Sequence, residues 1–220
     1  MADILAQSSN VGTVMIGQQL GDRKFGSWVD RFGFGAPTGI DYPGEEQGIV
    51  PEPSEYSGAS IGNLPIGQGL SVTPLQMMAG YSAIANGGIL RTPSLVESID
   101  GVPVTDDEGT RVISRRTASE VRSMLEGVTA AGGTASEVEV PGYVLAGKTG
   151  TAQKVEDGTY SETKFIASFV GFAPAADPRL LVAVIVDEPQ GDYYGGSVAA
   201  PAFGEIASFA LPYLGIPSTG

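Results

Sequence analysis

Apolar and polar positions recur with helical spacing over the first part of the chain. Residues 2–7 are typical of the end of a helix, which the polar residues 8–10 interrupt. Asn10 can cap a second helix that runs to Leu20 and stops at Gly21. Asp22 can cap a third helix that ends at Gly33. The apolar positions of these two helices are Val11, Val14 and Met15, then Phe25, Trp28, Val29 and Phe32.

Turn-forming residues then replace this periodicity. The Gly35–Gly69 segment is rich in glycine and proline and predicts a long ordered loop, which in a compact domain is usually functional. Thr73-Pro74 opens the next helix, because a capping threonine is followed by proline at the first helical position. Residues 86–88, Asn-Gly-Gly, stop that helix.

Between the helices, Ile89–Ile99 predicts a strand or extended segment with a turn at Asp100-Gly101. Thr117-Ala118-Ser119-Glu120 has the pattern of a capping box. An amphipathic helix is expected after it, because Val121, Met124, Leu125 and Val128 follow at helical spacing.

Three segments predict strands in the last third: Val144–Val155, Phe165–Phe172 and Leu180–Val186. Short turns near residues 157–158 and 176–178 join them, so we expect an antiparallel meander. The third run has no polar face, which predicts a central strand covered on both sides. Apolar residues from Phe203 to Leu211 predict a terminal helix that lies across the sheet. The order of elements is that of an α+β fold.

The amino-acid composition excludes several kinds of catalytic and metal site, although it says little about the fold. The 220 residues include no cysteine and no histidine, which excludes thiol catalysis, a Ser-His-Asp hydrolase and any zinc site built with Cys or His. An activated serine would need a lysine, a carboxylate or a tyrosine as its base. The lysines are Lys24, Lys148, Lys154 and Lys164. The net charge of −13 argues against nucleic-acid binding, which depends on Lys and Arg contacts to phosphate.

Other features exclude more than they assign. Asp41, Glu45 and Glu46 could suggest calcium, but a solvated acidic loop explains them better. For this reason we expect no metal. The glycine-rich stretches lack the spacing of a phosphate-binding loop, so we expect no cofactor. No apolar run approaches the roughly 18 residues of a spanning helix, and we expect no signal peptide. Met1 leads directly into helical sequence, so we expect a soluble piece of a larger protein.

The stretch with most chemical character is Gly147-Lys148-Thr149-Gly150-Thr151-Ala152. A lysine directly after a buried apolar run must face a cleft or a counter-charge, since burying an unpaired ammonium is costly. Two threonines supply hydroxyls, and Gly147 and Gly150 allow close approach. The stretch is interpreted as a strand edge that holds an anion such as a carboxylate. A second candidate is Ser8-x-Asn10 at the first helix break, although both residues could be plain caps.

The whole chain resembles the transpeptidase domain of class B penicillin-binding proteins, especially the septal, division-type enzymes. The resemblance covers essentially all 220 residues. It is carried by motifs in the expected order and at wide spacing: Ser8-Ser9-Asn10-Val11-Gly12, Thr38 to Glu45, Gly67 to Gln76, Ala146 to Gln153, Tyr193-Tyr194-Gly195-Gly196 and Ala199-Ala200-Pro201.

The family uses Ser-x-x-Lys, then Ser-x-Asn, then Lys-Thr-Gly. The resemblance implies that Ser8 relays a proton to the leaving amine, and that Asn10 binds the substrate amide and orients the nucleophile's lysine. It implies that Lys148 adds positive potential beside Gly150. The Thr149 and Thr151 hydroxyls are then expected to bind the terminal carboxylate of a donor peptide or a β-lactam, and the Thr151 N–H to form one arm of an oxyanion hole.

The nucleophile motif departs from this pattern. The family places it before Ser8, and the match at Ser161-Glu162-Thr163-Lys164 falls instead between the first two strands, where an exposed hairpin turn is expected. We therefore interpret that match as a coincidence. The resemblance also implies that strands and a central helix of a five-stranded sheet are missing. We expect the isolated chain to be inactive and to associate through its unpaired sheet edge.

Three readings stay open at this stage. The first is a D,D-transpeptidase that cross-links peptidoglycan stem peptides through a serine acyl-enzyme, here as one partial domain with a helical part over residues 1–132 and a sheet part over 133–220. The second is a related D,D-carboxypeptidase or serine β-lactamase. The third is a non-catalytic binding or docking module. By resemblance, the parent protein is membrane-anchored with this domain outside the cytoplasm, and its partners are division and glycosyltransferase proteins.

Overall fold

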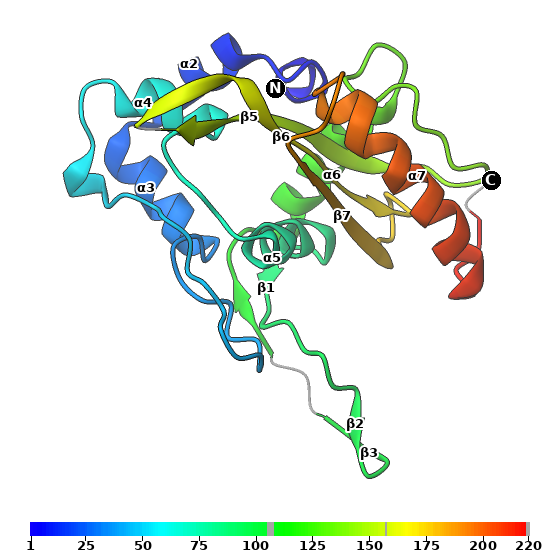
Figure 1. Cartoon of the computed structure of the whole chain (residues 1–220). Helices are drawn as coiled ribbons and strands as arrows, with labels where there is room; N and C mark the ends of the chain where they lie inside the picture. The colour runs from blue at the N-terminus through cyan, green and yellow to red at the C-terminus, as the bar shows by residue number, and fades with distance from the viewer. Residues whose placement is uncertain (105–107, 157, 219–220) are drawn as a thin grey trace. The chain divides into compact units, whose positions relative to one another are not determined.

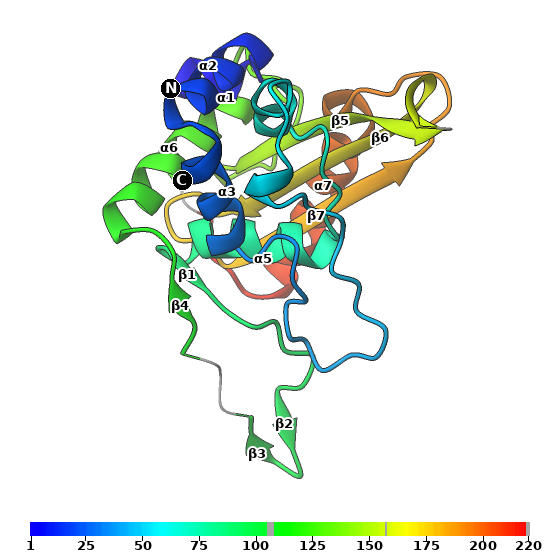
Figure 2. The ribbon, with the colours of Figure 1, turned by 90° about the vertical axis from the view of Figure 1, so that its left-hand side faces the viewer.

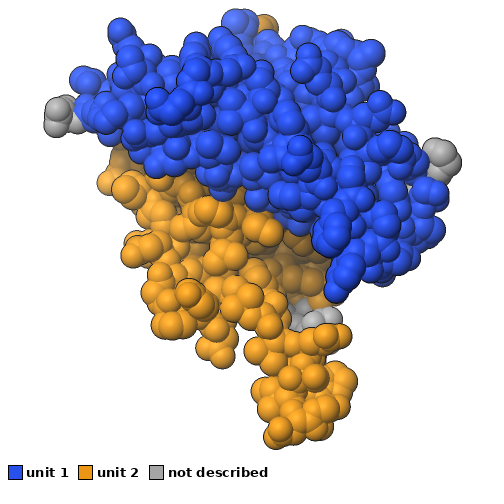
Figure 3. Space-filling view, turned by 45° about the vertical axis from the view of Figure 1, so that its right-hand side comes forward, with its two compact units in different colours: residues 1–12, 119–220 blue, residues 13–118 orange. Residues whose placement is uncertain are grey.

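The computed structural model describes residues 1–104, 108–156 and 158–218. The chain forms two compact units, one of residues 1–12 and 119–220 and the other of residues 13–118, which Figure 3 shows in different colours. The division into 1–132 and 133–220 stays a prediction. Each unit is described separately.

The first unit is built on a three-stranded antiparallel sheet. Its strands are β5 (Ala146–Glu156), β6 (Thr159–Ala173) and β7 (Leu180–Asp187), in the spatial order β5-β6-β7. The predicted meander is therefore confirmed. Asp157, in the first predicted turn, lies outside the described residues.

The terminal helix α7 (Gly195–Tyr213) lies across this sheet, as predicted (Figure 1). The phenyl ring of Phe169 on β6 packs against that of Phe203 on α7, with 4.8 Å between ring centroids. Both side chains are fully buried. They join a hydrophobic core between sheet and helix whose larger members also include Val128, Val138, Val140, Leu145, Leu211 and Ile216.

The position of β7 corrects the prediction of a central strand. β7 pairs with β6 along one side only, so within the described residues it is an edge strand. Its apolar side chains are partly exposed, and Ile185 keeps 42% of its surface accessible. A run without a polar face indicates burial on both faces, but it does not determine how many neighbours the strand has.

The N-terminal helices form close to the predicted positions, with different caps. Helix α1 (Ala2–Ala6) is followed by α2 (Asn10–Leu20), so Asn10 is the first helical residue. The Ser9 hydroxyl accepts a hydrogen bond from the Gly12 N–H at 3.2 Å and caps α2 in its place. Val11 and Met15 are exposed on α2, and the buried position is Gly17.

Helices α3 and α6 show the same shift at their starts. Helix α3 (Asp22–Arg31) begins at Asp22, with Gly21 as its N-cap. Helix α6 (Arg115–Thr129) begins before the predicted capping box, because the Ser114 hydroxyl accepts a hydrogen bond from the Thr117 N–H at 3.0 Å. In two of the three cases the cap is a serine, which lies one residue before the predicted cap in α2 and three residues before it in α6.

The second unit holds the predicted long loop and the helix after it. Short helical turns interrupt residues 35–69 without making them regular: η1 (Pro53–Glu55), α4 (Ser60–Asn63) and η2 (Leu64–Ile66). Helix α5 (Pro74–Ala85) begins as predicted, since the Thr73 hydroxyl accepts from the Gln76 N–H at 3.2 Å while the Gln76 side chain accepts from the Thr73 N–H at 2.9 Å.

Two short antiparallel pairs complete this unit. β1 (Ile89–Leu90) pairs with β4 (Thr110–Arg111), and β2 (Ser98–Ile99) pairs with β3 (Val102–Pro103). Asp100 and Gly101 both have positive φ, as a tight hairpin turn needs, so the predicted turn is confirmed. The β2–β3 hairpin extends away from the β1–β4 pair (Figure 2).

None of the helices among the described residues combines the length and the apolar character that crossing a bilayer demands.

Candidate active site

The strand β5 carries the predicted Lys-Thr-Gly-Thr stretch at its start. Thr149 is paired with Phe169 of β6, and Thr151 with Ala167. Directly opposed residues of an antiparallel pair point to the same face, so both threonines lie on the face that Phe169 presents to α7. Lys148 is paired with Val170 and belongs to the other face. Because side chains alternate between the two faces of β5, the Lys148 side chain leaves the strand on the face opposite the two threonine hydroxyls.

Glycine at the start of α7 lets the helix approach this strand closely. A Cβ atom on Gly195 would clash with the backbone oxygens of Gly150 and Ser168. The helix therefore begins directly against the β5–β6 pair. The Gly195 N–H donates a hydrogen bond to the Thr151 hydroxyl oxygen at 3.0 Å. This bond fixes the Thr151 side chain while it leaves the Thr151 hydroxyl hydrogen free to donate elsewhere.

Lys148 is partly buried and is the one charged residue in the stretch 147–152. Its Nζ donates to the backbone oxygen of Thr149 at 3.1 Å and reaches the Thr149 hydroxyl at 3.5 Å. Across the residues that the structure describes, no carboxylate pairs with it. Burial without a counter-charge lowers the pKa of Lys148 from 10.5 to about 8. A bound anion would supply the charge that this ammonium lacks.

Ser8 lies at the break between α1 and α2, as predicted, and Asn10 is the first residue of α2. Ser8 adopts a left-handed backbone conformation with φ of 51°, and both side chains are exposed. No hydrogen bond within the described part of the chain joins either side chain to Lys148 directly. The two sequence-predicted groups are connected instead through a third segment.

That third segment is the loop at residues 132–134, which the sequence did not single out. The Gln7 side chain donates a hydrogen bond to the Gly132 oxygen, and the Thr134 N–H donates to the Ala6 oxygen at 3.1 Å. The hydroxyls of Thr134 and Thr149 are 2.8 Å apart. The segment that ends in Ser8 and the strand that carries Thr149 are thus held by the same loop. A Gly-Gly-Thr sequence gives no signal of this role, because the contacts are distant in sequence.

The Ser161–Lys164 match does not form a nucleophile site. These residues lie on β6 itself rather than in the predicted turn. The Lys164 Nζ pairs with Glu156, which raises the pKa of Lys164. Ser161 accepts hydrogen bonds from the N–H groups of Thr163 and Lys164. The lysine is thus committed to a carboxylate, not to the serine hydroxyl.

The acidic loop has a structural role. The Glu45 carboxylate accepts hydrogen bonds from the N–H and the hydroxyl of Thr38, and from the Gly39 N–H. These bonds lower the pKa of Glu45. In the described residues, no group of three or more Asp and Glu side chains has the arrangement of a metal site.

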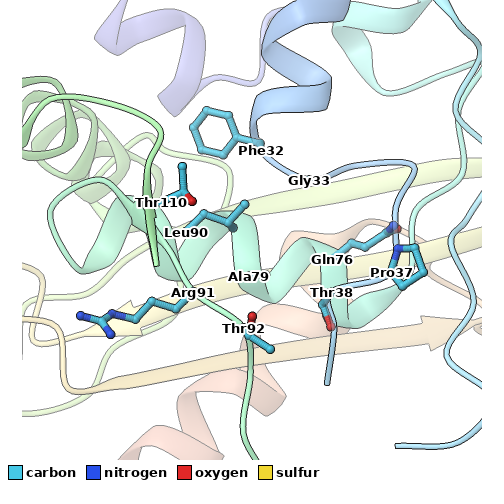
Figure 4. Close-up of a pocket in the computed structure, with 10 residues that line it drawn as sticks. All are labelled: Phe32, Gly33, Pro37, Thr38, Gln76, Ala79, Leu90, Arg91, Thr92 and Thr110. Carbon is cyan, nitrogen blue, oxygen red and sulfur yellow. The ribbon is translucent and has the colours of Figure 1, made fainter. Parts of the chain in front are cut away.

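A separate cavity of about 170 Å³ lies in the second unit (Figure 4). Its one fully buried polar side chain, Gln76, donates to the backbone oxygens of Ala36 at 2.7 Å and Gln47 at 2.8 Å. Both amide hydrogens are used, so Gln76 holds the loop rather than a ligand. The β5 stretch remains the candidate site.

Comparison with known proteins identifies the family of this chain. The family model described as the penicillin binding protein transpeptidase domain matches residues 1–208. The penicillin-binding protein PbpB of Mycolicibacterium smegmatis is 42% identical over 97% of this chain and 35% of its own length. The probable peptidoglycan D,D-transpeptidase PenA of Neisseria meningitidis is 36% identical over 98% of this chain and 36% of its own length. The chain thus spans about a third of these curated relatives.

The fold is shared with solved structures. Penicillin-binding protein 3 of Mycobacterium tuberculosis, complexed with aztreonam, matches with a TM-score of 0.89 and 36% identity, over 100% of this chain and 52% of the other. The sheet, the closing helix and the long central loop are therefore those of an α+β transpeptidase domain. The chain belongs to the penicillin-binding protein transpeptidase family.

Proposed function

We propose that this chain supplies the carboxylate-binding side of a D,D-transpeptidase site that cross-links peptidoglycan stem peptides. The observation that carries the proposal is Lys148, which is partly buried, has no carboxylate partner in the described residues and reaches the Thr149 hydroxyl at 3.5 Å. A terminal D-alanine carboxylate is an anion of the size that two hydroxyls and an ammonium can hold. The aztreonam complex of the similar structure makes β-lactams the natural second ligand class.

Each residue of the site has a distinct role in this proposal. The Thr149 and Thr151 hydroxyls donate to the carboxylate, and Lys148 adds positive potential. The Thr151 N–H stabilises the developing oxyanion, a contribution of about 3 kcal/mol for one well-placed donor. Ser8 passes a proton to the leaving amine, and Asn10 binds the donor peptide amide. Gly150 belongs to the face opposite the two threonines, where a Cβ atom would clash with the hydroxyl of Ser168 on β6.

We further propose that the chain alone forms no acyl-enzyme. Its one Ser-x-x-Lys match lies on β6 with its lysine paired to Glu156. The parent protein is then a membrane-anchored enzyme with this domain outside the cytoplasm, acting with division and glycosyltransferase proteins. The chain itself binds the ligand reversibly.

A fluorescent penicillin tests both statements. Fluorescence polarisation should report reversible binding, and denaturing gels should show no labelled band. Thr149→Val and Thr151→Val should each weaken binding about tenfold, because each removes a hydrogen bond to a charged group worth about 1.5–3 kcal/mol. Thr163→Val is the matched control, since Thr163 is exposed on β6 outside the site. A covalent adduct at one per chain would refute the proposed inactivity. If Thr149→Val and Thr151→Val both bound the penicillin as tightly as wild type, the carboxylate site would be refuted.

We also propose that the free edge of β7 mediates self-association. An apolar edge strand exposes unpaired backbone groups to a second chain. Ile185→Lys on β7 should lower the mass measured by light scattering, because a charge on an edge strand opposes pairing. Ile206→Lys is the control, since Ile206 on α7 is 45% exposed against 42% for Ile185. A monomeric wild type at all concentrations would contradict this.

A further inference from the structure

The Thr134 hydroxyl contacts the candidate site, although Thr134 belongs to none of the predicted motifs. Its oxygen lies 2.8 Å from the Thr149 hydroxyl oxygen, and either group could be the donor. Thr134 is part of the 132–134 loop and is partly buried. The direction of this one bond decides where the Thr149 proton points.

Hydroxyl accounting separates the two possibilities. A threonine hydroxyl has one hydrogen to donate and two lone pairs that accept. The Thr151 oxygen accepts from the Gly195 N–H, which can only donate, so the Thr151 hydrogen is available to a ligand. The Thr149 oxygen is already approached by the Lys148 ammonium at 3.5 Å, another group that can only donate. If Thr134 also donates, both lone pairs of Thr149 are occupied and its hydrogen is free.

We propose that Thr134 is a positioning residue of the carboxylate site. It donates its hydroxyl hydrogen to Thr149, so that the Thr149 hydrogen points to the ligand in the same sense as that of Thr151. This inference rests on the proposed function. The opposite direction would spend the Thr149 hydrogen on Thr134 and turn a lone pair toward the carboxylate, which repels it.

The backbone around Thr134 holds its hydroxyl in place. The Thr134 N–H donates to the Ala6 oxygen at 3.1 Å, and the next N–H, that of Ala135, donates to the Val128 oxygen at 2.9 Å. A Cβ atom on Gly196, in the first turn of α7, would clash with the Thr134 oxygen. Thr134 is therefore fixed by α1, α6 and α7 before any ligand arrives. A preorganised hydroxyl of this kind orients its neighbour at little entropic cost.

The test is titration of the full chain with N-acyl-D-alanyl-D-alanine, followed by NMR. Thr134→Val removes the hydroxyl at constant shape and should weaken binding about fivefold, the effect of one ordinary hydrogen bond. Thr134→Ser keeps the hydroxyl and should bind like wild type. In a Thr149→Val background, Thr134→Val should have no further effect. The dipeptide with an amidated carboxyl end should bind neither wild type nor Thr134→Val.

The outcomes separate this inference from the function on which it rests. Wild-type binding that Thr134→Val leaves unchanged, or that Thr134→Ser weakens equally, overturns the positioning role alone. A Thr134→Val effect that persists in the Thr149→Val background also overturns it. Absence of carboxylate-dependent binding by the wild type overturns both proposals. Amide spectra and unfolding curves establish that each variant is folded, with Thr134→Ala as a second hydroxyl-free variant.

Discussion

The lowered pKa of Lys148 gives a prediction with a definite size and sign. Lys148 is partly buried, and within the described residues the hydrogen bonds of its Nζ go to the backbone oxygen and the hydroxyl of Thr149. Replacing it with methionine keeps most of the aliphatic stem and removes the charge. At neutral pH, Lys148→Met should therefore be more stable than wild type.

The magnitude follows from the two protonation states. A change in pKa from 10.5 to about 8 corresponds to about 3 kcal/mol, which is the upper limit of the gain. Below pH 8 both the folded and the unfolded chain carry the proton, so the cost of the buried charge is complete. Between pH 8 and 10.5 the unfolded chain binds more protons than the folded chain, so the contribution of Lys148 to stability rises with pH. The advantage of Lys148→Met should shrink over that interval.

Two measurements check this reasoning. Denaturant unfolding of wild type and Lys148→Met at pH 7 and pH 10 gives the difference in free energy, and the subtraction cancels the titration of other groups. NMR of chains labelled at lysine Cε gives the titration midpoint directly. Lys154 and Lys164 serve as internal references, because their carboxylate partners raise their pKa values. A Lys148 midpoint near 10.5, or a stability difference that does not depend on pH, would refute the account.

Two further perturbations test packing beside the site and the loop of the second unit. Gly195→Ala should lower the free energy of unfolding by more than about 2 kcal/mol, because a Cβ atom would meet backbone rather than a flexible side chain; denaturant unfolding measures it, and Gly62→Ala, with open space around it, should be neutral. Gln76→Met should cost about 2–4 kcal/mol, since it leaves the Ala36 and Gln47 oxygens without their donor. Hydrogen exchange should then rise across residues 36–48, and unchanged protection there would show that Gln76 does not hold the loop.

The regular elements could be predicted from the sequence wherever a local signal was sufficient. The Thr73 cap and its proline fix the start of α5, and three strand segments with short turns between them define the meander. Helix starts were less certain, because neighbouring polar residues compete for the cap. Ser9 and Ser114 cap α2 and α6, although Asn10 and Thr117 are also of residue types that cap helices. Which of these residues becomes the cap depends on how the first helical turn packs against the rest of the protein, and that packing involves residues distant in sequence.

The site was predicted in part for the same reason. Lys148, Thr149 and Thr151 stand out because a lysine after a buried apolar run needs an explanation, and the family resemblance then supplies roles. Thr134 has no comparable signal, since it acts through a contact with Thr149 fifteen residues away and a backbone bond to Ala6. The edge position of β7 was missed because strand order is a property of the whole sheet.

The central claim is that the Lys148 strand is a carboxylate site, and amide chemical-shift mapping with N-acyl-D-alanyl-D-alanine tests it most directly. The account predicts that the largest shifts fall on residues 147–152 and at Gly195, whose N–H binds the Thr151 hydroxyl. It also predicts that they disappear when the carboxyl end is amidated. Shifts located elsewhere, or of equal size with the amidated peptide, would contradict the claim.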